Sequence, residues 1–316
     1  MNSDCPAGRA WLAKQPGDVR ASAASWLATP ALSALAHALG GPLIRSVPDD
    51  LPALAQWSRQ VLDTRGGAER HEALPASPPD KTIRLIADAG RDLGLLATSP
   101  PELSTYDMTV ILGGTATGNR LRVGLAAEFA QRGTDLGTIA GLSARRLITA
   151  SERTAEQVPG TERAEWQNLL RELSTAFRPS SRSHYEPQET IANFQTAPDK
   201  GFTNPAGREM RILVAPSRNL KRRADTADSI GYLVHRIPPV RRRRMLIITS
   251  TIYAPYQFFA IAPQLLAAET EHAELVGTAT QTTGDKAVLA QRIAQEIHSA
   301  INATCHLWPA SKIARQ

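Results

Sequence analysis

The stretch DMTVILGG (Asp107 to Gly114) is an apolar run closed by two glycines. A run that is apolar on both faces of an extended chain is typical of a strand buried between two layers of helices. The segment GNRLRVGLAAEFAQRG (Gly118 to Gly133) follows with the period of a helix. A buried strand that leads into a helix is the unit from which parallel sheets are built.

The same alternation continues toward the C-terminus. Four more strands are predicted, at LGTIAGL (Leu136 to Leu142), MRILVAPS (Met210 to Ser217), MLIITST (Met245 to Thr251) and AELVGTA (Ala273 to Ala279). Further helices are predicted at Glu162 to Phe177, Arg223 to Ile237, Pro255 to Ala268 and Lys286 to Asn302. This pattern predicts an α/β protein with a Rossmann-like three-layer fold and a mostly parallel sheet of about five strands.

The N-terminal third has a different pattern. Apolar residues at helical spacing predict an N-terminal helical region over residues 1–104, with helices at Leu51 to Val61 and Lys81 to Leu96. We expect this region to pack on the α/β domain, residues 105–316, because so short a chain buries too little surface to be stable alone. The segment Arg178 to Arg208 is polar and irregular, and it is predicted to be a loop.

Composition narrows the class of protein. Of the 316 residues, 42% are hydrophobic and 21% charged, which excludes a disordered chain, a collagen and a coiled coil. The apolar stretch from Thr29 to Ile44 is too short and too interrupted to span a membrane. The N-terminal residues lack the apolar segment of a signal peptide, so we expect a cytoplasmic protein. The chain has two cysteines, Cys5 and Cys305. This number excludes a disulfide framework and a zinc site built mainly on thiolates.

The net charge is +6, and 30 of the 36 basic residues are arginines. The planar guanidinium fits carboxylates and phosphates, although a GC-rich genome also replaces lysine by arginine. The runs RNLKRR (Arg218 to Arg223) and RRRR (Arg241 to Arg244) make nucleic-acid binding an alternative function. Neither run is interleaved with aromatic residues, as proteins that bind single strands tend to be. A small anionic or nucleotide-like molecule is therefore the favoured partner.

In a doubly wound sheet, ligands bind beyond the carboxyl ends of the strands. Polar residues follow three of the predicted strands at this position. The candidate ligand-binding residues are Gly113, Gly114, Thr115, Asn119, Arg120, Ser217, Arg223, Thr226, Thr249, Ser250, Tyr253, Tyr256 and Gln257. The glycines would admit a phosphate or carboxylate to a helix N-terminus, and the arginines would neutralise it. Asp225 and Glu162 are the candidate acid–base catalysts.

Each of these features also has a purely structural interpretation. The two glycines can form a tight turn, Asp225 or Thr226 can cap a helix, and the tyrosines can border the core. The glycine spacing matches neither the dinucleotide-binding fingerprint nor the P-loop. None of the seven histidines directly follows a predicted strand, so no metal site is predicted.

Three segments in order, LGG…GNR, PS…RADTAD and TSTIYAPY, resemble motifs of the YdcF-like family, also called SanA/ElyC-like. The resemblance covers roughly Thr105 to Thr278. It implies an α/β domain, and some members of that family are linked to S-adenosylmethionine, which makes this molecule a candidate ligand. Where the family has a histidine and an arginine after its Thr-Ser pair, this chain has Tyr253 and Tyr256. The chemistry of histidine-bearing members therefore does not transfer.

Three functions stay open at this stage. The first is a transferase or hydrolase that acts on a nucleotide-like or anionic molecule. The second is a non-catalytic sensor or accessory protein that uses the same pocket, and the third is a nucleic-acid-binding protein. The sequence does not predict the oligomeric state.

Overall fold

The computed structural model describes residues 11–13, 16–65, 78–156, 158, 162–177, 200–203, 207–217, 224–237, 243–280 and 284–308. The chain divides into two compact units. The first unit comprises Met1–Pro100, Ser250–Pro263 and Ala279–Gln316, and the second comprises Pro101–Thr249 and Gln264–Thr278. Helix α9 (Ala254–Ala267) begins in the first and ends in the second. No helix among the described residues is long and apolar enough to cross a membrane.

The first unit is mainly helical. Its other elements are β1 (Trp11–Ala13), α1 (Pro16–Leu27), α2 (Pro30–Ala38), α3 (Leu51–Val61), α4 (Asp80–Asp92), η2 (Thr251–Tyr253) and α10 (Lys286–Cys305). The hydroxyl of Thr29 caps α2 by accepting from the backbone N–H of Leu32, and Pro30 occupies the first turn, where its missing N–H costs nothing.

Helix α10 packs against α3 and α4, although it lies about 200 residues later in the chain. A Cβ at Gly90 would lie 2.6 Å from Cγ2 of Ile293, so α4 and α10 approach closely only because residue 90 is a glycine. The indole of Trp26 is fully buried, donates to the carbonyl of Leu93 at 3.0 Å and packs edge-on against Phe259. The core of this unit is therefore assembled from distant parts of the chain.

The second unit is built on a β-sheet. Its strands are β2 (Met108–Leu112), β3 (Thr138–Ala144), β4 (Lys200–Thr203), β5 (Glu209–Ala215), β6 (Arg244–Ser250) and β7 (His272–Thr278). They are arranged in the order β7-β6-β2-β3-β5-β4, and the first five of these are parallel. Strand β4 pairs with β5 in the antiparallel direction. This confirms the predicted α/β fold with a mostly parallel sheet.

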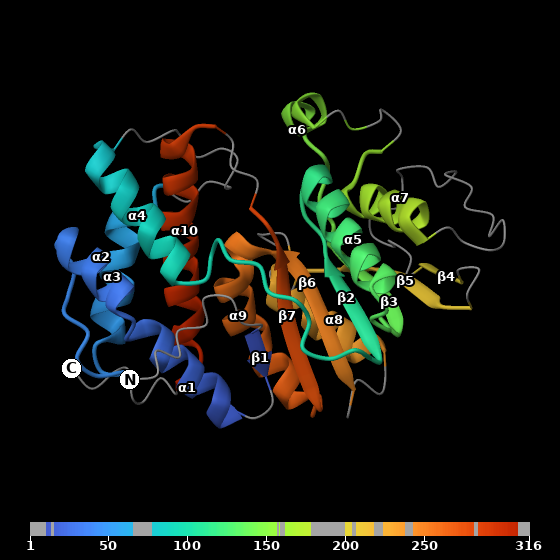
Figure 1. Cartoon of the computed structure of the whole chain (residues 1–316), viewed down its shortest axis with the longest axis horizontal. Helices are drawn as coiled ribbons and strands as arrows, with labels where there is room; N and C mark the ends of the chain where they lie inside the picture. The colour runs from blue at the N-terminus through green and yellow to red at the C-terminus, as the bar shows by residue number, and fades with distance from the viewer. Residues whose placement is uncertain are drawn as a thin grey trace. The chain divides into compact units, whose positions relative to one another are not determined.

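Helices cover the sheet on both faces (Figure 1). Helices α5 (Ala116–Gln131) and α7 (Glu165–Phe177) pack against each other in front of the strands in this view. Helix α8 (Thr226–Arg236) contacts β3 and β5 and lies behind them. The short helix α6 (Ala150–Ala155) lies beyond the ends of the strands. Because helices lie on both faces, the central strands are mainly apolar.

Some details differ from the sequence-based expectations. The apolar runs at residues 110–112, 212–214 and 246–248 predict three neighbouring buried strands of one sheet. They are buried in one sheet, but β3 separates β2 from β5. Strand β3 begins two residues later than predicted, after Gly137, whose φ of +56° is not that of a strand. The loop predicted over residues 178–208 contains β4, which hydrogen bonds to β5 stabilise. Residues 178–199 lie outside the described residues.

Candidate functional site

The strand order of the second unit reverses between β2 and β6. From β2 the chain proceeds to β3 and β5 on one side, and then returns to β6 and β7 on the other. Ile111 and Ile248 lie opposite each other, so Gly113 and Thr249 both follow at the carboxyl edge of the sheet, where the strands end. Such a switch point is where open α/β sheets bind their ligands.

The backbone around Gly113 and Gly114 is held tightly. The N–H of Gly113 donates to the carbonyl of Leu142 at 2.6 Å, which joins the end of β2 to β3. A Cβ at Gly113 would lie 2.5 Å from Oε1 of Glu165, and one at Gly114 would lie 3.0 Å from Nη1 of Arg122. The close packing of the turn therefore needs a glycine at residue 113, whereas at residue 114 the guanidinium of Arg122 would have to shift, and this supports the structural interpretation of the turn.

A chain of buried side-chain amides leads from this turn to α7. Oδ1 of Asn119 accepts from the N–H of Gly114 at 2.9 Å, and its Nδ2 donates to Oδ1 of Asn168 at 2.8 Å. Nδ2 of Asn168 in turn donates to Oε2 of Glu162 at 2.9 Å. The other oxygen of Glu162 accepts from Arg171. Asn119 and Asn168 are fully buried, so these hydrogen bonds satisfy amides that would otherwise be costly to bury.

Charged side chains surround the same turn. The buried Arg122 donates from Nη1 to the carbonyls of Leu112 and Gly113, and thus places positive charge beneath the turn. Arg146 donates to Glu152 and Glu165 at 2.6–2.9 Å and to the carbonyl of Gly114 at 3.2 Å. Burial acts to lower the pKa of Arg146, but the hydrogen bonds and charges of the two carboxylates outweigh it and raise the pKa.

The N-terminus of α5 begins directly after the glycines. Thr115 is the N-cap, and its hydroxyl accepts from the N–H of Gly118 at 3.2 Å. The N–H of Thr117 donates to Oε2 of Glu156 at 2.5 Å, so a carboxylate of the chain itself is bound at this helix end. Arg120, one turn into α5, is exposed to solvent.

The second predicted segment, which follows β5, caps α8. Asp225 is the N-cap and accepts from the N–H of Asp228 at 2.8 Å, and Asp228 accepts from the N–H of Asp225 at 3.2 Å. This reciprocal pair is a capping box. Thr226 is the first residue of α8, and Ser217 is half-buried two residues after β5. Arg223 lies outside the described residues.

The remaining candidates follow β6. Thr249 is fully buried in β6 and belongs to the second unit. Ser250 ends β6, Tyr253 ends η2, and Tyr256 and Gln257 lie in the first turn of α9, all within the first unit. The convergence of these four residues with the glycine turn stays a prediction.

One further residue at the carboxyl edge was not selected from the sequence. Thr278 ends β7 and is 7% exposed, and its Oγ1 has no hydrogen-bond partner among the described residues. A buried hydroxyl without a partner is uncommon in native proteins. Thr278 lies at the same edge of the sheet as Thr249 and Gly113, on a neighbouring strand.

Sequence reasoning also missed Arg122, Glu165 and Asn168. Arg122 occurs in α5 at a helical spacing with Ala126 and Phe129, both of which are buried. Glu165 and Asn168 likewise occur beside Leu169 on the buried face of α7. One signal in the sequence could have identified these three residues. Each is polar and occupies a position that helical periodicity assigns to the core.

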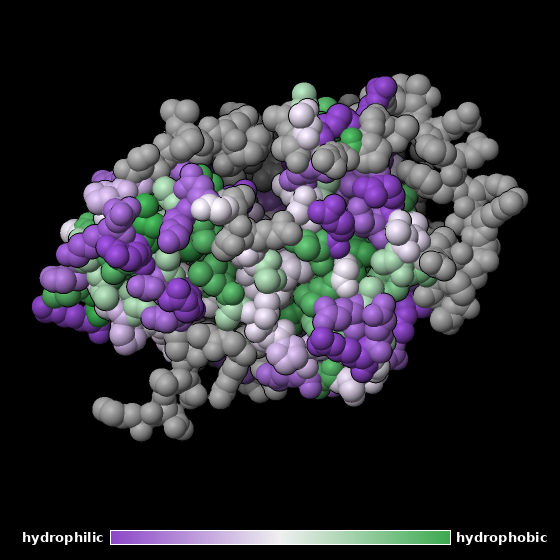
Figure 2. All heavy atoms as spheres, turned by 45° about the horizontal axis from the view of Figure 1, so that its top comes forward, coloured by the Kyte–Doolittle hydropathy of each residue, from purple (hydrophilic) through white to green (hydrophobic). Residues whose placement is uncertain are grey.

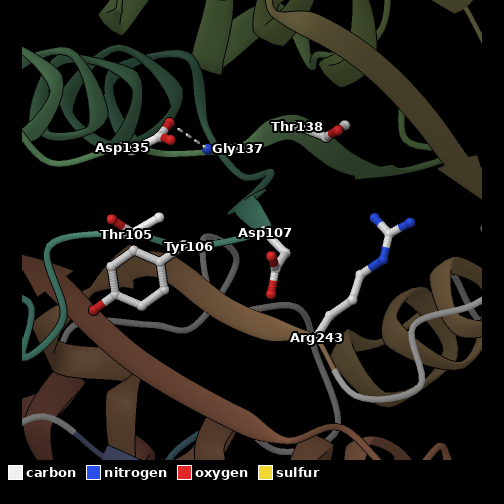
Figure 3. Close-up of a pocket in the computed structure, with 7 residues that line it drawn as sticks. All are labelled: Thr105, Tyr106, Asp107, Asp135, Gly137, Thr138 and Arg243. Carbon is white, nitrogen blue, oxygen red and sulfur yellow. Dashed lines mark hydrogen bonds between the residues drawn. The ribbon is translucent and has the colours of Figure 1, made fainter.

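An open hollow lies at the opposite edge of the sheet, where the strands begin. It has a volume of about 550 Å³. We call it the amino-edge hollow. It is lined by Thr105, Tyr106, Asp107, Asp135, Gly137, Thr138 and Arg243 (Figure 3). None of these residues was selected as a site from the sequence, because the switch-point rule directs attention to the other edge.

The fold and the switch point define an α/β protein with a parallel sheet and a glycine turn at the reversal of strand order. A family model described as the Rv3785 N-terminal domain matches residues 12–94. The chain is 27% identical over 281 residues to uncharacterized protein Rv3785 of Mycobacterium tuberculosis strain H37Rv, a match that covers 77% of each chain. Uncharacterized protein Mb3814 of Mycobacterium bovis matches with the same identity and coverage. No solved structure matches the chain significantly.

Proposed function

We propose that this protein binds a nucleotide-like or otherwise anionic small molecule at the carboxyl edge of the sheet in the second unit. The observation that carries the proposal is the buried, unpartnered hydroxyl of Thr278 at the edge where the strand order reverses. A ligand atom that accepts or donates there would satisfy this group. The guanidinium of Arg122 beneath the glycine turn adds positive potential at the same edge, which favours an anionic ligand.

The hydrogen bonds of the two candidate catalytic residues favour a protein that binds its ligand without catalysis. Glu162 accepts hydrogen bonds from Asn168 and Arg171, and Asp225 caps α8, so both candidate acid–base groups have structural partners. These hydrogen bonds give both carboxylates a structural role in holding a helix or a relay of amides. This supports the sensor or accessory role over a transferase or hydrolase.

The ionic contacts of Arg244, in the run Arg241 to Arg244, and of Arg208 also bear on the nucleic-acid alternative. Arg244 lies 3.5 Å from Oδ2 of Asp107, and Arg208 pairs with Asp135 at 3.0 Å. These carboxylates reduce the positive charge that the surface offers to a phosphate backbone. The face shown in Figure 2 mixes hydrophilic and hydrophobic residues.

Native mass spectrometry of freshly purified protein tests the proposal directly, because a retained small molecule appears as added mass. Calorimetric titration with S-adenosylmethionine, ATP and inorganic phosphate then identifies the class of ligand. S-adenosylmethionine is included because of the resemblance to the YdcF-like family.

Thr278→Val is the most informative variant, because it removes the hydroxyl and keeps the shape. We expect binding to weaken roughly threefold to tenfold, the equivalent of one hydrogen bond. The free energy of unfolding without ligand should not fall, since the hydroxyl has no partner to lose.

Arg120→Ala should weaken the binding of an anionic ligand. Arg132→Ala, at the far end of α5, is the matched control and should leave binding unchanged. Unchanged binding in both Thr278→Val and Arg120→Ala would show that the ligand binds elsewhere.

A further inference from the structure

The amino-edge hollow is lined by two carboxylates, each paired with an arginine next to the hollow, and by a third arginine, Arg243. Arg244 neutralises Asp107: its backbone N–H donates to Oδ2 at 2.7 Å, and its Nε lies 3.5 Å from the same oxygen. Arg208 pairs with Asp135 at 3.0 Å and also donates to the carbonyl of Gly137 at 2.9 Å. Both carboxylates therefore already have a cationic partner within the protein.

The third arginine, Arg243, is in a different situation. Its side chain is half-buried and makes no hydrogen bond or ion pair with any described residue. Figure 3 shows it extending from the start of β6 toward the segment that carries Thr138. The N–H groups of Glu271 and His272 donate to its carbonyl at 3.2 and 3.3 Å, so its backbone is held in place. An uncompensated guanidinium in a hollow is a receptor for an oxyanion.

The wall opposite Arg243 is held rigidly by main-chain hydrogen bonds. The N–H of Tyr106 donates to the carbonyl of Asp135 at 2.8 Å, and the N–H of Thr138 donates to that of Asp107 at 3.1 Å. Gly137 has a φ of +56°, and a Cβ there would lie 2.3 Å from the carbonyl oxygen of Asp107. Only glycine allows the two segments to approach so closely. The hollow is thus formed before any ligand binds, which lowers the entropy cost of binding.

We propose that the amino-edge hollow binds a small phosphorylated polyol, of the size of a sugar phosphate. The guanidinium of Arg243 would hold the phosphate, and the hydroxyls of Thr105 and Thr138 are placed on the wall of the same hollow to contribute. The carboxylates of Asp107 and Asp135 still have acceptor capacity for the hydroxyl groups of the polyol. The volume of about 550 Å³ lies in the range of small-molecule sites.

The balance of charge in the hollow also favours one kind of anion. Because Asp107 and Asp135 are each paired with an arginine, the charge of Arg243 is the one in the lining that no described residue compensates. A ligand with one anionic group and several hydroxyls matches this single charge better than a polyanion such as an oligonucleotide does. Arg243, which belongs to the run Arg241 to Arg244, would thus bind one phosphate group specifically, and the run would not serve only to attract nucleic acid.

Calorimetric titration of the full chain with ribose 5-phosphate, glycerol 3-phosphate, inorganic phosphate and a single-stranded oligonucleotide tests the proposal. We expect ribose 5-phosphate to bind more tightly than inorganic phosphate, because only the former has hydroxyls for the carboxylates. Arg243→Ala should weaken it about tenfold or more, the equivalent of a hydrogen bond to a charged group. Arg243→Lys should restore part of the affinity, since it keeps the charge and loses the planar fork. Circular dichroism and thermal unfolding confirm that each variant is folded.

Arg120→Ala separates this site from the carboxyl-edge site, because Arg120 lies at the opposite end of the strands. Loss of ribose 5-phosphate binding in Arg243→Ala but not in Arg120→Ala supports the proposal, whatever the fate of the carboxyl-edge site. It is overturned if wild-type protein binds none of the phosphorylated probes at millimolar concentration, or if Arg243→Ala binds them as wild type does. Tighter binding of the oligonucleotide than of ribose 5-phosphate would also overturn it, in favour of a nucleic-acid surface.

Discussion

Asn119 on α5 donates from its Nδ2 to Oδ1 of Asn168 on α7 at 2.8 Å, and both side chains are fully buried. Because Oδ1 of Asn119 also accepts from the N–H of Gly114, a single side chain connects the glycine turn, α5 and α7. The turn at the reversal of strand order is therefore held in position by the helix packing of one face of the sheet.

Replacement of Asn119 by alanine should destabilise the second unit. It leaves the N–H of Gly114 and the side-chain Oδ1 of Asn168 without these partners, and a buried unsatisfied group costs about 1–3 kcal/mol. Urea unfolding followed by circular dichroism measures the loss. Gln131→Ala, at the exposed end of the same helix, is the control and should change the free energy of unfolding by less than about 0.5 kcal/mol. An equal effect of the two variants would contradict the role assigned to Asn119.

Arg146→Ala should be more damaging than any substitution of an exposed arginine. The side chain of Glu165 is only 5% exposed, so the loss of Arg146 leaves a buried carboxylate without its charged partner. Breaking a buried ion pair in this way costs about 3–5 kcal/mol. Arg132, which pairs with Glu128 on the surface of α5, provides the matched control, with an expected loss below about 1 kcal/mol. Similar unfolding midpoints for the two variants would argue against this ranking.

Tyr106→Phe should destabilise the second unit by about 1.5–3 kcal/mol, because it removes a hydrogen bond to a charged group. The hydroxyl of Tyr106 donates to Oε2 of Glu274, which is fully buried in β7. Burial, together with this hydrogen bond to Glu274, raises the pKa of Tyr106. Tyr232→Phe in α8 is the control for the same chemical change, because the hydroxyl of the half-buried Tyr232 accepts an exposed hydrogen bond from Arg236. A free energy of unfolding equal to that of wild type would show that Glu274 needs no such donor.

His298 should make the first unit sensitive to acid. Its ring lies between Ser58, 3.0 Å from Nδ1, and Asn302, 3.2 Å from Nε2. Burial lowers the pKa of His298 below its usual value of 6.5, although the charge of Asp63 opposes this effect. Between the lowered pKa and about 6.5, the unfolded chain binds more protons than the folded protein, so stability falls as the pH falls through this window.

Chemical unfolding at pH 8, 7, 6 and 5 measures this dependence. Substitution of His298 by glutamine keeps a polar side chain and removes the titrating group, so the slope between pH 7 and 5 should flatten. His306→Gln, at an exposed position just after α10, is the matched control and should leave the slope unchanged. A wild-type slope in His298→Gln would assign the acid sensitivity to another group.

Local pattern was enough to predict the central strands and the helices of the second unit. Runs such as VIL at residues 110–112 and LII at 246–248 are apolar on both faces, and that pattern indicates a strand covered by helices on either side. The three-residue interval between Asp225 and Asp228 likewise matches the capping box that begins α8. These features depend on residues within a few positions of one another, so their physical cause is present in the sequence itself.

Contacts between distant residues decided the rest. Strand β4 forms because β5 offers its backbone groups for pairing, and no apolar period at residues 200–203 predicts it. The relay from Gly114 through Asn119 to Asn168 joins residues up to 54 positions apart. The amino-edge hollow brings Arg243 together with Thr138, which is 105 positions earlier in the chain. Periodicity indicates which face of an element is buried, but the partner of each polar group depends on strand order and helix packing, which only the folded chain defines.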